Sequence, residues 1–385
     1  MDWERIRRDF PVTKEMAYFE SAAMSPIPTP VFEAIMSEYR KLVEWGDANW
    51  CRDLERLNAV KSVCADLLNG REEDIAFVAN TSTAMSMTGL SVHKKLEPDQ
   101  HFLTMKDEFP SSTFPFSYLG IPLRTCEPDS ARYTVSSLLE QINSKTAGIV
   151  TSYVQFGTGF RQDLLSLGEE LKRRNLLFIV NATQGFPYFH IDVKEMRIDV
   201  LAASLHKWGM TGHLGSLFYT APEFRAKYPT AVAGWLSIDP GEGLVPGQMN
   251  SSPEIHSSAQ QYTLGTINLQ LLMAFKTALD YIQKIGLDVI RKRLFTLTDY
   301  LLDGLSDCSV EVISPHRSYA ERSAIVSFKV GKKSPECVTF LRKNKIYVSQ
   351  RNDAVRAAVN IFNNFNDLDR LLDGVQNFCD KIPLS

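Results

Sequence analysis

Short apolar runs alternate with amphipathic segments along the first 220 residues. The runs are apolar throughout, which predicts parallel strands covered on both faces. Between them, periodic segments such as "LLSLGEELKRRN", from Leu164, place leucines on one face and charges on the other and so predict helices. Strands are expected at residues 74–80, 101–105, 147–154, 176–181, 200–205 and 215–220, and further helices at 30–45 and 53–68. The alternation predicts an α/β fold.

The pattern changes after about residue 270. One long helical stretch, residues 269–305, leads into short strands at 309–314 and 323–330 and into helices near 334–343 and 366–380. We therefore expect a large α/β domain and a smaller α+β C-terminal domain. Their expected bounds are 15–270 for the large domain and 271–385, with 1–14, for the small one. Residues 229–262 are irregular and rich in Gly, Pro and Ser, as are loops that close over enzyme sites.

Composition narrows the class of protein. The 385 residues are 44% hydrophobic and 23% charged with a net charge of −3, which excludes a disordered chain and indicates no nucleic-acid or membrane partner. The N-terminus lacks a signal-peptide pattern, and no apolar run approaches the roughly 20 residues of a membrane helix. The six cysteines are scattered and the seven histidines show no metal-ligand spacing. We expect free thiols, no metal site and a cytoplasmic location.

Polar and aromatic residues follow four of the expected strands, at the sheet edge where ligands of parallel α/β proteins bind. Each has an ordinary structural explanation by itself, such as a helix cap or a packed aromatic ring. Taken in order, they are what a pyridoxal phosphate pocket requires: a helix start for the phosphate, an aromatic plate, a hydrogen-bonding side chain and a lysine that forms a Schiff base. These residues are Thr81, Ser82, Phe109, Asn181, Gln184, Ser204, His206 and Lys207.

Six motifs in order resemble the class V aminotransferases of fold type I, the family that includes cysteine desulfurases and isopenicillin N epimerase-like proteins. The resemblance covers nearly the whole chain. It implies the cofactor pyridoxal 5'-phosphate, a mostly parallel seven-stranded sheet in the large domain and a homodimer with shared active sites. The motifs are "YFESAAMSPIP" (18–28), "NTSTA" (80–84), "DEFPSS" (107–112), "SLHKW" (204–208), "YTLGTIN" (262–268) and "AVRAAVNIFNN" (354–364).

The resemblance also implies a role for each matching residue. Lys207 is the Schiff-base lysine and the proton shuttle at the substrate Cα. Phe109 stacks on the cofactor ring, Gln184 contacts the ring hydroxyl, and Arg356 binds the substrate α-carboxylate. The phosphate contacts are Thr81, Ser82, Ser204 and His206, with Thr266 reaching the phosphate of the neighbouring subunit.

Three positions depart from the family pattern. Asn181 stands where the family has an aspartate that keeps the ring nitrogen protonated, which predicts slower proton removal at Cα. The stretch "VSQRNDAVR" (348–356) lacks the nucleophilic cysteine of cysteine desulfurases, so a persulfide-forming desulfurase is disfavoured. Glu20 and Ser21 replace the usual Asp-Asn pair.

An aminotransferase acting on a small amino acid, with the matching keto acid, is the favoured hypothesis. A pyridoxal phosphate-dependent lyase, for C–S cleavage or β-elimination, and an epimerase use the same lysine and arginine. A catalytically weak binding or regulatory protein is a further alternative because of Asn181. Four more side chains are candidates either for the substrate side or for packing: Tyr18, Phe156, Trp235 and His256.

Overall fold

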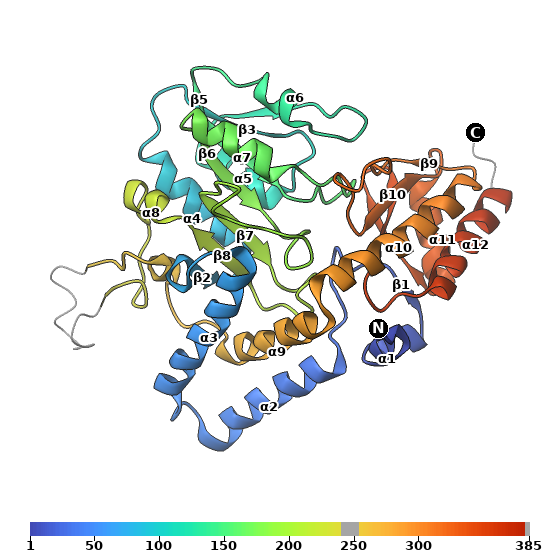
Figure 1. Cartoon of the computed structure of the whole chain (residues 1–385), viewed down its shortest axis with the longest axis horizontal. Coiled ribbons are helices and arrows are strands. Elements are labelled where there is room, and N and C mark those ends of the chain that lie inside the picture. Colours follow the sequence, from blue (N-terminus) through green and yellow to red (C-terminus); the bar gives the residue numbers. More distant parts are fainter. Residues whose placement is uncertain (240–253, 382–385) are drawn as a thin grey trace.

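A seven-stranded sheet forms the centre of the larger part of the molecule (Figure 1). The computed structural model describes residues 1–239 and 254–381. The spatial order is β2 (Ile75–Val78), β8 (Ser216–Thr220), β7 (Val200–Ser204), β6 (Leu177–Asn181), β5 (Thr146–Ser152), β3 (His101–Met105) and β4 (Leu123–Cys126). All neighbours are parallel except that β8 runs antiparallel to β2 and β7, which confirms the predicted mostly parallel sheet.

The six strands of this sheet that were expected from apolar runs are all present, and β4 is its seventh strand, which the pattern did not predict. This strand lies at the sheet edge beside β3. Its Arg124 and Thr125 are exposed, so it has no continuous apolar run. An edge strand can leave side chains exposed to solvent, so it can carry polar residues. It then lacks the continuous apolar run that marks the other strands of this sheet.

Helices surround this sheet. In α7, Leu164, Leu167 and Leu171 are buried on one face, and the Asp163 carboxylate accepts the Ser166 backbone N–H at 3.0 Å to cap the start, as the leucine periodicity predicts. The helices of this part are α2 (Thr29–Trp45), α3 (Trp50–Leu68), α4 (Thr81–His93), α5 (Pro110–Tyr118), α6 (Val135–Leu139), α7 (Leu164–Arg173) and α8 (Pro222–Lys227).

The long helical stretch is helical as predicted, and it forms two helices. Helix α9 (Leu269–Ile285) and helix α10 (Leu287–Ser306) meet at Gly286, whose φ of +94° is strained for residues with a side chain. Helix α9 packs against α2 and α3, whereas α10 runs across to the C-terminal part (Figure 1). The glycine therefore redirects the chain from one part of the molecule to the other.

The C-terminal part is built on a four-stranded antiparallel sheet in the order β12 (Ser349–Arg351), β13 (Ala354–Ala358), β10 (Ile325–Lys329) and β9 (Glu311–Val312). Helices α11 (Ser334–Lys343) and α12 (Phe365–Lys381) lie close to the segments predicted as helical. A second hydrophobic cluster holds Phe19 and most of the buried apolar residues from Leu297 onward. Helix α10 contributes to both clusters, with Leu294 in the first and Leu297 in the second. The domain bounds stay a prediction.

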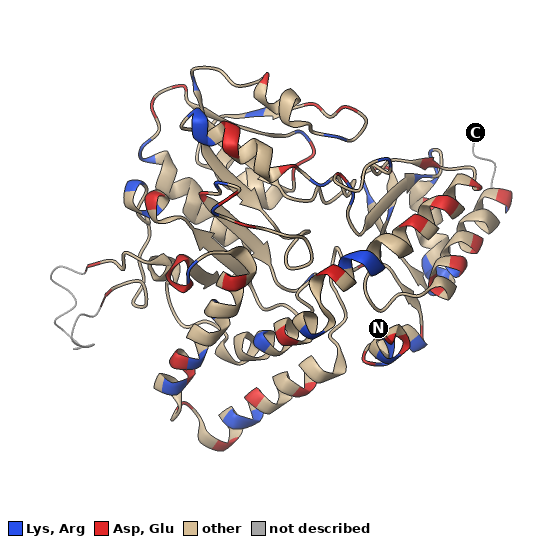
Figure 2. Ribbon diagram, viewed as in Figure 1, with Lys and Arg blue, Asp and Glu red and all other residues tan. Residues whose placement is uncertain are grey.

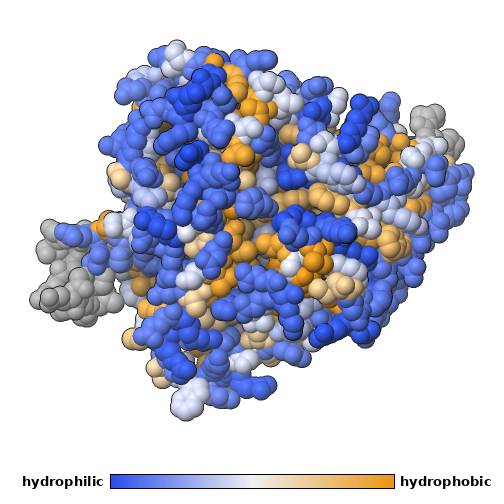
Figure 3. Space-filling view, viewed as in Figure 1, coloured by the Kyte–Doolittle hydropathy of each residue, from blue (hydrophilic) through white to orange (hydrophobic). Residues whose placement is uncertain are grey.

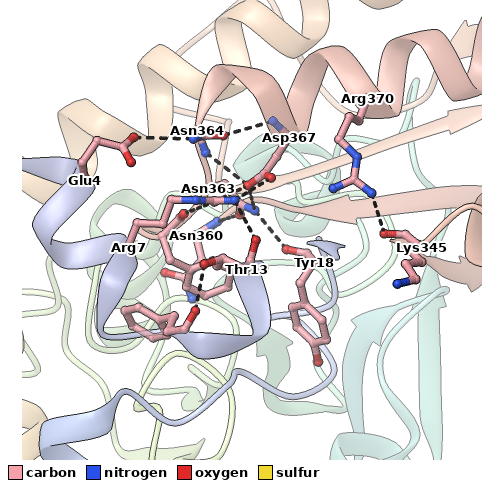
Figure 4. A network of polar contacts seen from close by, with 12 residues as sticks. Glu4, Arg7, Thr13, Tyr18, Lys345, Asn360, Asn363, Asn364, Asp367 and Arg370 are labelled. Carbon is pink, nitrogen blue, oxygen red and sulfur yellow. Dashed lines mark hydrogen bonds and ion pairs between the residues drawn. The ribbon is translucent and has the colours of Figure 1, made fainter. Parts of the chain in front are cut away.

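The N-terminal segment is tied to the C-terminal part by a network of polar contacts (Figure 4). Helix α1 (Trp3–Arg8) carries Arg7, which pairs with the Asp367 carboxylate at 2.6 Å and donates to the Phe362 carbonyl at 2.7 Å. Strand β1 (Ala17–Tyr18) pairs with β11 (Ile346–Tyr347), and the Asn363 amide donates to the Tyr18 carbonyl at 3.0 Å. These contacts fix the start of the segment that continues to Ala22 at the site described below.

Charges of both signs are interspersed over the helices (Figure 2). In the face drawn in Figure 3, polar residues cover most of the surface and apolar residues gather near its middle. Within residues 1–239 and 254–381, no helix combines the length and the apolar character that a membrane crossing requires.

Candidate cofactor site

Strand ends of the large sheet and one hairpin of the small sheet enclose a cavity of about 280 Å³. Most of the residues predicted from the sequence meet there. The predicted residues in its lining are Thr81, Ser82, Phe109, Gln184, Ser204, His206, Lys207 and Arg356. Phe156, one of the candidates for the substrate side, also lines it, and the structure adds Ala22, Ala23, Asn80, Ser111 and Arg351. A smaller adjoining pocket shares Lys207 and Phe109 and is also lined by Asn181.

The other candidates lie elsewhere. Thr266 is exposed, just before α9, and does not line the cavity. Trp235 and His256 line a separate cavity beside α3. Tyr18 donates its hydroxyl to the Met24 carbonyl at 2.7 Å. Of the four candidates for the substrate side, only Phe156 lines this cavity.

Lys207 is partly buried in the turn that follows β7. Its amine lies 5.3 Å from the centroid of the Phe109 ring. The turn is tight at Gly209, where a Cβ would lie 2.5 Å from the Leu205 carbonyl oxygen. Burial, and then the charges of Arg356 and Arg351, lower the pKa of Lys207 to about 7. A large share of this amine is therefore neutral and nucleophilic at neutral pH.

The lowered pKa predicts an unusual pH profile for this amine. In the cofactor-free protein, we expect methylation of Lys207 by formaldehyde and borohydride to level off just above its pKa of about 7. Methylation of a lysine-containing reference peptide in the same sample should continue to rise towards about pH 10, the ordinary range for lysine. Short labelling pulses followed by peptide mass spectrometry measure both in one sample. Parallel profiles for the two lysines would contradict the prediction.

Hydroxyl groups gather where helix α4 begins. The Thr81 hydroxyl lies 2.6 Å from the Ser204 hydroxyl and 3.5 Å from that of Thr183, which accepts the Ser204 backbone N–H at 3.0 Å. Burial, and then Lys207 and His213, lower the pKa of His206 to about 4, so its ring is neutral at neutral pH. Neutral donors at a helix N-terminus suit a phosphate group.

Two buried amides line the smaller pocket beside Lys207 with fixed orientations. The Asn181 side chain donates to the Ser112 hydroxyl at 2.9 Å and accepts the Thr183 backbone N–H at 3.1 Å. The Gln184 side chain donates to the Ala22 carbonyl at 2.9 Å and accepts the Trp208 indole N–H at 2.9 Å. Each amide NH2 group uses one of its two hydrogens in these bonds, so each side chain keeps one N–H group as a further donor.

Glu108, which the sequence reasoning did not single out, is a buried carboxyl group behind Asn181. It accepts the Ser152 backbone N–H at 2.6 Å and the Phe109 backbone N–H at 2.7 Å, and it also interacts with Ser112. Burial raises the pKa of Glu108 to about 7. Its place inside the "DEFPSS" motif was the only available signal, because burial is not visible in one sequence.

Arg356 is almost fully buried on β13, with 1% of its surface exposed. It donates to the Phe156 carbonyl at 2.7 Å and weakly to the Ser349 hydroxyl at 3.4 Å, while its Nε has no partner among the described residues. Burial, and then the charge of Arg351, lower the pKa of Arg356 to about 9. A buried donor without a partner is costly unless a ligand satisfies it, which marks this guanidinium as a binding group.

The family model described as Aminotransferase class-V matches residues 17–371. The chain belongs to this family. A probable cysteine desulfurase of Pyrococcus abyssi is 26% identical over 396 residues, covering 96% of each chain. The apo cysteine desulfurase of Thermococcus onnurineus has a TM-score of 0.88 at 22% identity, covering 98% of each chain. The cystine C–S lyase C-DES, in complex with its product cysteine persulfide, has a TM-score of 0.85 at 20% identity, covering 96% of this chain and 99% of its own.

These comparisons confirm the predicted family, the fold type I architecture and the cofactor of this class V chain. A variant of C-DES carries glycine covalently linked to its pyridoxal phosphate cofactor. The residues here fit the same group. They offer a lysine amine with a lowered pKa beside an aromatic ring, hydroxyls at a helix start, and an arginine Nε without a partner.

Proposed function

We propose that this class V chain is a pyridoxal phosphate-dependent enzyme that acts at the Cα of a small amino acid. The observation that carries the proposal is the Lys207 amine, which has a pKa of about 7 and lies beside Phe109 in a cavity that also holds Arg356. When bound, the cofactor supplies an electron sink for the electron pair released at Cα.

The roles proposed for the other residues follow their positions. Arg356 binds the α-carboxylate through its free Nε, a task suited to a planar guanidinium. Lys207 moves the proton at Cα. Phe109 stacks on the ring, Gln184 donates to the ring hydroxyl and Asn181 to the ring nitrogen. The phosphate contacts are Thr81, Ser82, Ser204 and His206.

Among the possible reactions, C–S cleavage by β-elimination now ranks above the transamination that the sequence favoured. Relatives described as cysteine desulfurases and a cystine C–S lyase support this order. The hairpin between β12 and β13 turns at Asn352 and Asp353, and no cysteine is among the described residues that line the cavity. We therefore propose release of the sulfur product without an enzyme persulfide, with transamination as the second candidate.

Half-reactions separate these candidates. Purified protein loaded with pyridoxal phosphate is mixed with L-cysteine, L-cystine or L-alanine, and its spectrum and products are followed. With L-cysteine and water, elimination gives pyruvate, ammonia and hydrogen sulfide and leaves the cofactor unchanged. Transamination leaves the amine form of the cofactor and a keto acid, and epimerisation gives only the enantiomer. A loaded protein that turns over no amino acid supports the binding or regulatory alternative and contradicts the proposal.

We also propose that the protein is a homodimer formed across α2. Helix α2 lies at the lower edge of the molecule in Figure 1. Four large apolar side chains are exposed along one face of it: Phe32 (52%), Met36 (48%), Tyr39 (39%) and Val43 (87%). Their spacing of three or four residues makes one stripe. The Tyr39 hydroxyl accepts from the Asn268 amide at 2.9 Å, which ties the stripe to the segment that carries Thr266. A second copy on this stripe places Thr266 at a subunit boundary, as the resemblance implies.

The double substitution Met36→Asp with Val43→Asp is expected to produce monomers. Burying these side chains is worth about 1.5–3 kcal/mol each, so the dissociation constant should rise by about 100-fold or more. Sedimentation velocity over a concentration series measures the change. Ser37→Asp adds a carboxylate on an exposed side of the same helix, away from the stripe, and should leave the dimer intact. A dimer that tolerates the double substitution would place the interface elsewhere.

A further inference from the structure

The small sheet brings a second arginine to the same cavity. In the β12–β13 pair, Ser349 lies opposite Arg356 and Arg351 lies opposite Ala354. Cross-strand partners project from the same face of a sheet, and residues two apart on one strand share that face. Arg351 and Arg356 therefore project from one face, and both line the cavity.

Within the described residues, neither guanidinium forms an ion pair, although the charge of Glu20 acts on both. Among residues 1–239 and 254–381, no carboxylate forms an ion pair with Arg351, Arg356 or Lys207, and no acidic side chain lines the cavity. The nearby carboxylate of Glu20 is engaged by Arg342 at 2.5 Å and by the Ser349 hydroxyl at 3.1 Å.

The two arginines are held differently. Arg356 is anchored by the Phe156 carbonyl, whereas the one partner of Arg351 within residues 1–239 and 254–381 is the carbonyl of its own neighbour, Gln350, at 2.7 Å. Most of the Arg351 fork is therefore available to a ligand. Unpaired, partly buried cations repel one another, so an arrangement of this kind is favourable only when anions fill it.

Each donor group of the site can be matched with an anionic group of the substrate or of the cofactor. The α-carboxylate of an amino acid satisfies Arg356, and hydroxyls, the neutral His206 ring and the α4 N-terminus meet the phosphate. Arg351 is left over. We propose that the substrate is an amino acid whose side chain carries a second anionic group, such as a carboxylate, and that Arg351 binds this group. This inference rests on the proposed function.

Isosteric acid and amide pairs test the inference. Cofactor-loaded protein is titrated with L-aspartate against L-asparagine, and with L-glutamate against L-glutamine, and binding is followed by the cofactor spectrum. We expect each acid to bind about 10-fold or more tightly than its amide. Arg351→Gln should weaken binding of the acids by about 10- to 100-fold and leave the amides within about threefold. Lys343→Gln, which removes an exposed charge from the same part of the molecule, should change neither.

A ligand without an amine separates this inference from the proposed function. Calorimetry should show succinate binding more tightly than propionate, with the difference lost in Arg351→Gln. If succinate binds in this way but no amino acid alters the spectrum, the second-anion site stands and the proposed function is wrong. If amino acids alter the spectrum but acids and amides bind equally, the proposed function stands and the inference about Arg351 is overturned.

Discussion

Lys207→Ala is expected to abolish covalent cofactor attachment and to lower turnover by about 10⁴-fold. The amine combines two features that an alanine cannot supply: a pKa of about 7, and a position 5.3 Å from the Phe109 ring centroid. Borohydride treatment of the loaded wild-type protein should add the mass of the reduced cofactor to the peptide that contains Lys207. The same treatment of Lys207→Ala should add none.

Two comparisons make this result specific. Lys227→Ala removes an exposed lysine that lies over Tyr228, and it should leave both labelling and turnover unchanged. Non-covalent cofactor should still bind to Lys207→Ala through the α4 hydroxyls, which fluorescence titration with pyridoxal phosphate detects. Labelling of a different lysine in the wild-type protein would show that the site has been assigned to the wrong amine.

Much of the fold follows from the sequence because buried parallel strands have a strong signature. Strands such as β3 and β7 are buried at every position and were expected from their apolar runs. The polar edge strand β4 and the short hairpin strands β12 and β13 lack such runs. The break between α9 and α10 rests on one glycine, Gly286, whose backbone conformation cannot be inferred from the amphipathic pattern around it.

The candidate site, like the fold, could be predicted from the sequence only in part. Residues at strand ends, such as Ser204 and Lys207, were brought together as predicted because the order of parallel strands places those ends at one edge. Arg351 and Glu108 were missed because their importance depends on strand register and on burial against distant residues. Thr266 lies outside the cavity of a single chain, so its predicted role depends on the second copy. The roles of all these residues stay predictions.

Asn181→Asp is expected to keep the cofactor ring nitrogen protonated and to speed proton removal at Cα. In the wild-type protein the Asn181 oxygen accepts the Thr183 N–H, and its amide nitrogen keeps one hydrogen beyond the bond to Ser112, so the neutral side chain donates towards the ring and favours an unprotonated nitrogen. A carboxylate at this position favours the protonated nitrogen instead. Each unit gained in the pKa of that nitrogen is worth about 1.4 kcal/mol, so a rate increase of about 10-fold or more is expected.

Nitrogen NMR of protein loaded with ring-labelled cofactor reports the protonation state directly, and exchange of the Cα hydrogen of a bound amino acid for solvent deuterium reports the rate. Gln184→Glu is the matched control, because it places a carboxylate at an equally buried amide that we propose faces the ring hydroxyl, and it should leave the ring nitrogen unprotonated. Ser112→Ala removes the acceptor of the Asn181 amide and should loosen its orientation without adding charge. A wild-type ring nitrogen that is already protonated at neutral pH would overturn the argument, since a neutral amide supplies no negative charge to stabilise the protonated ring.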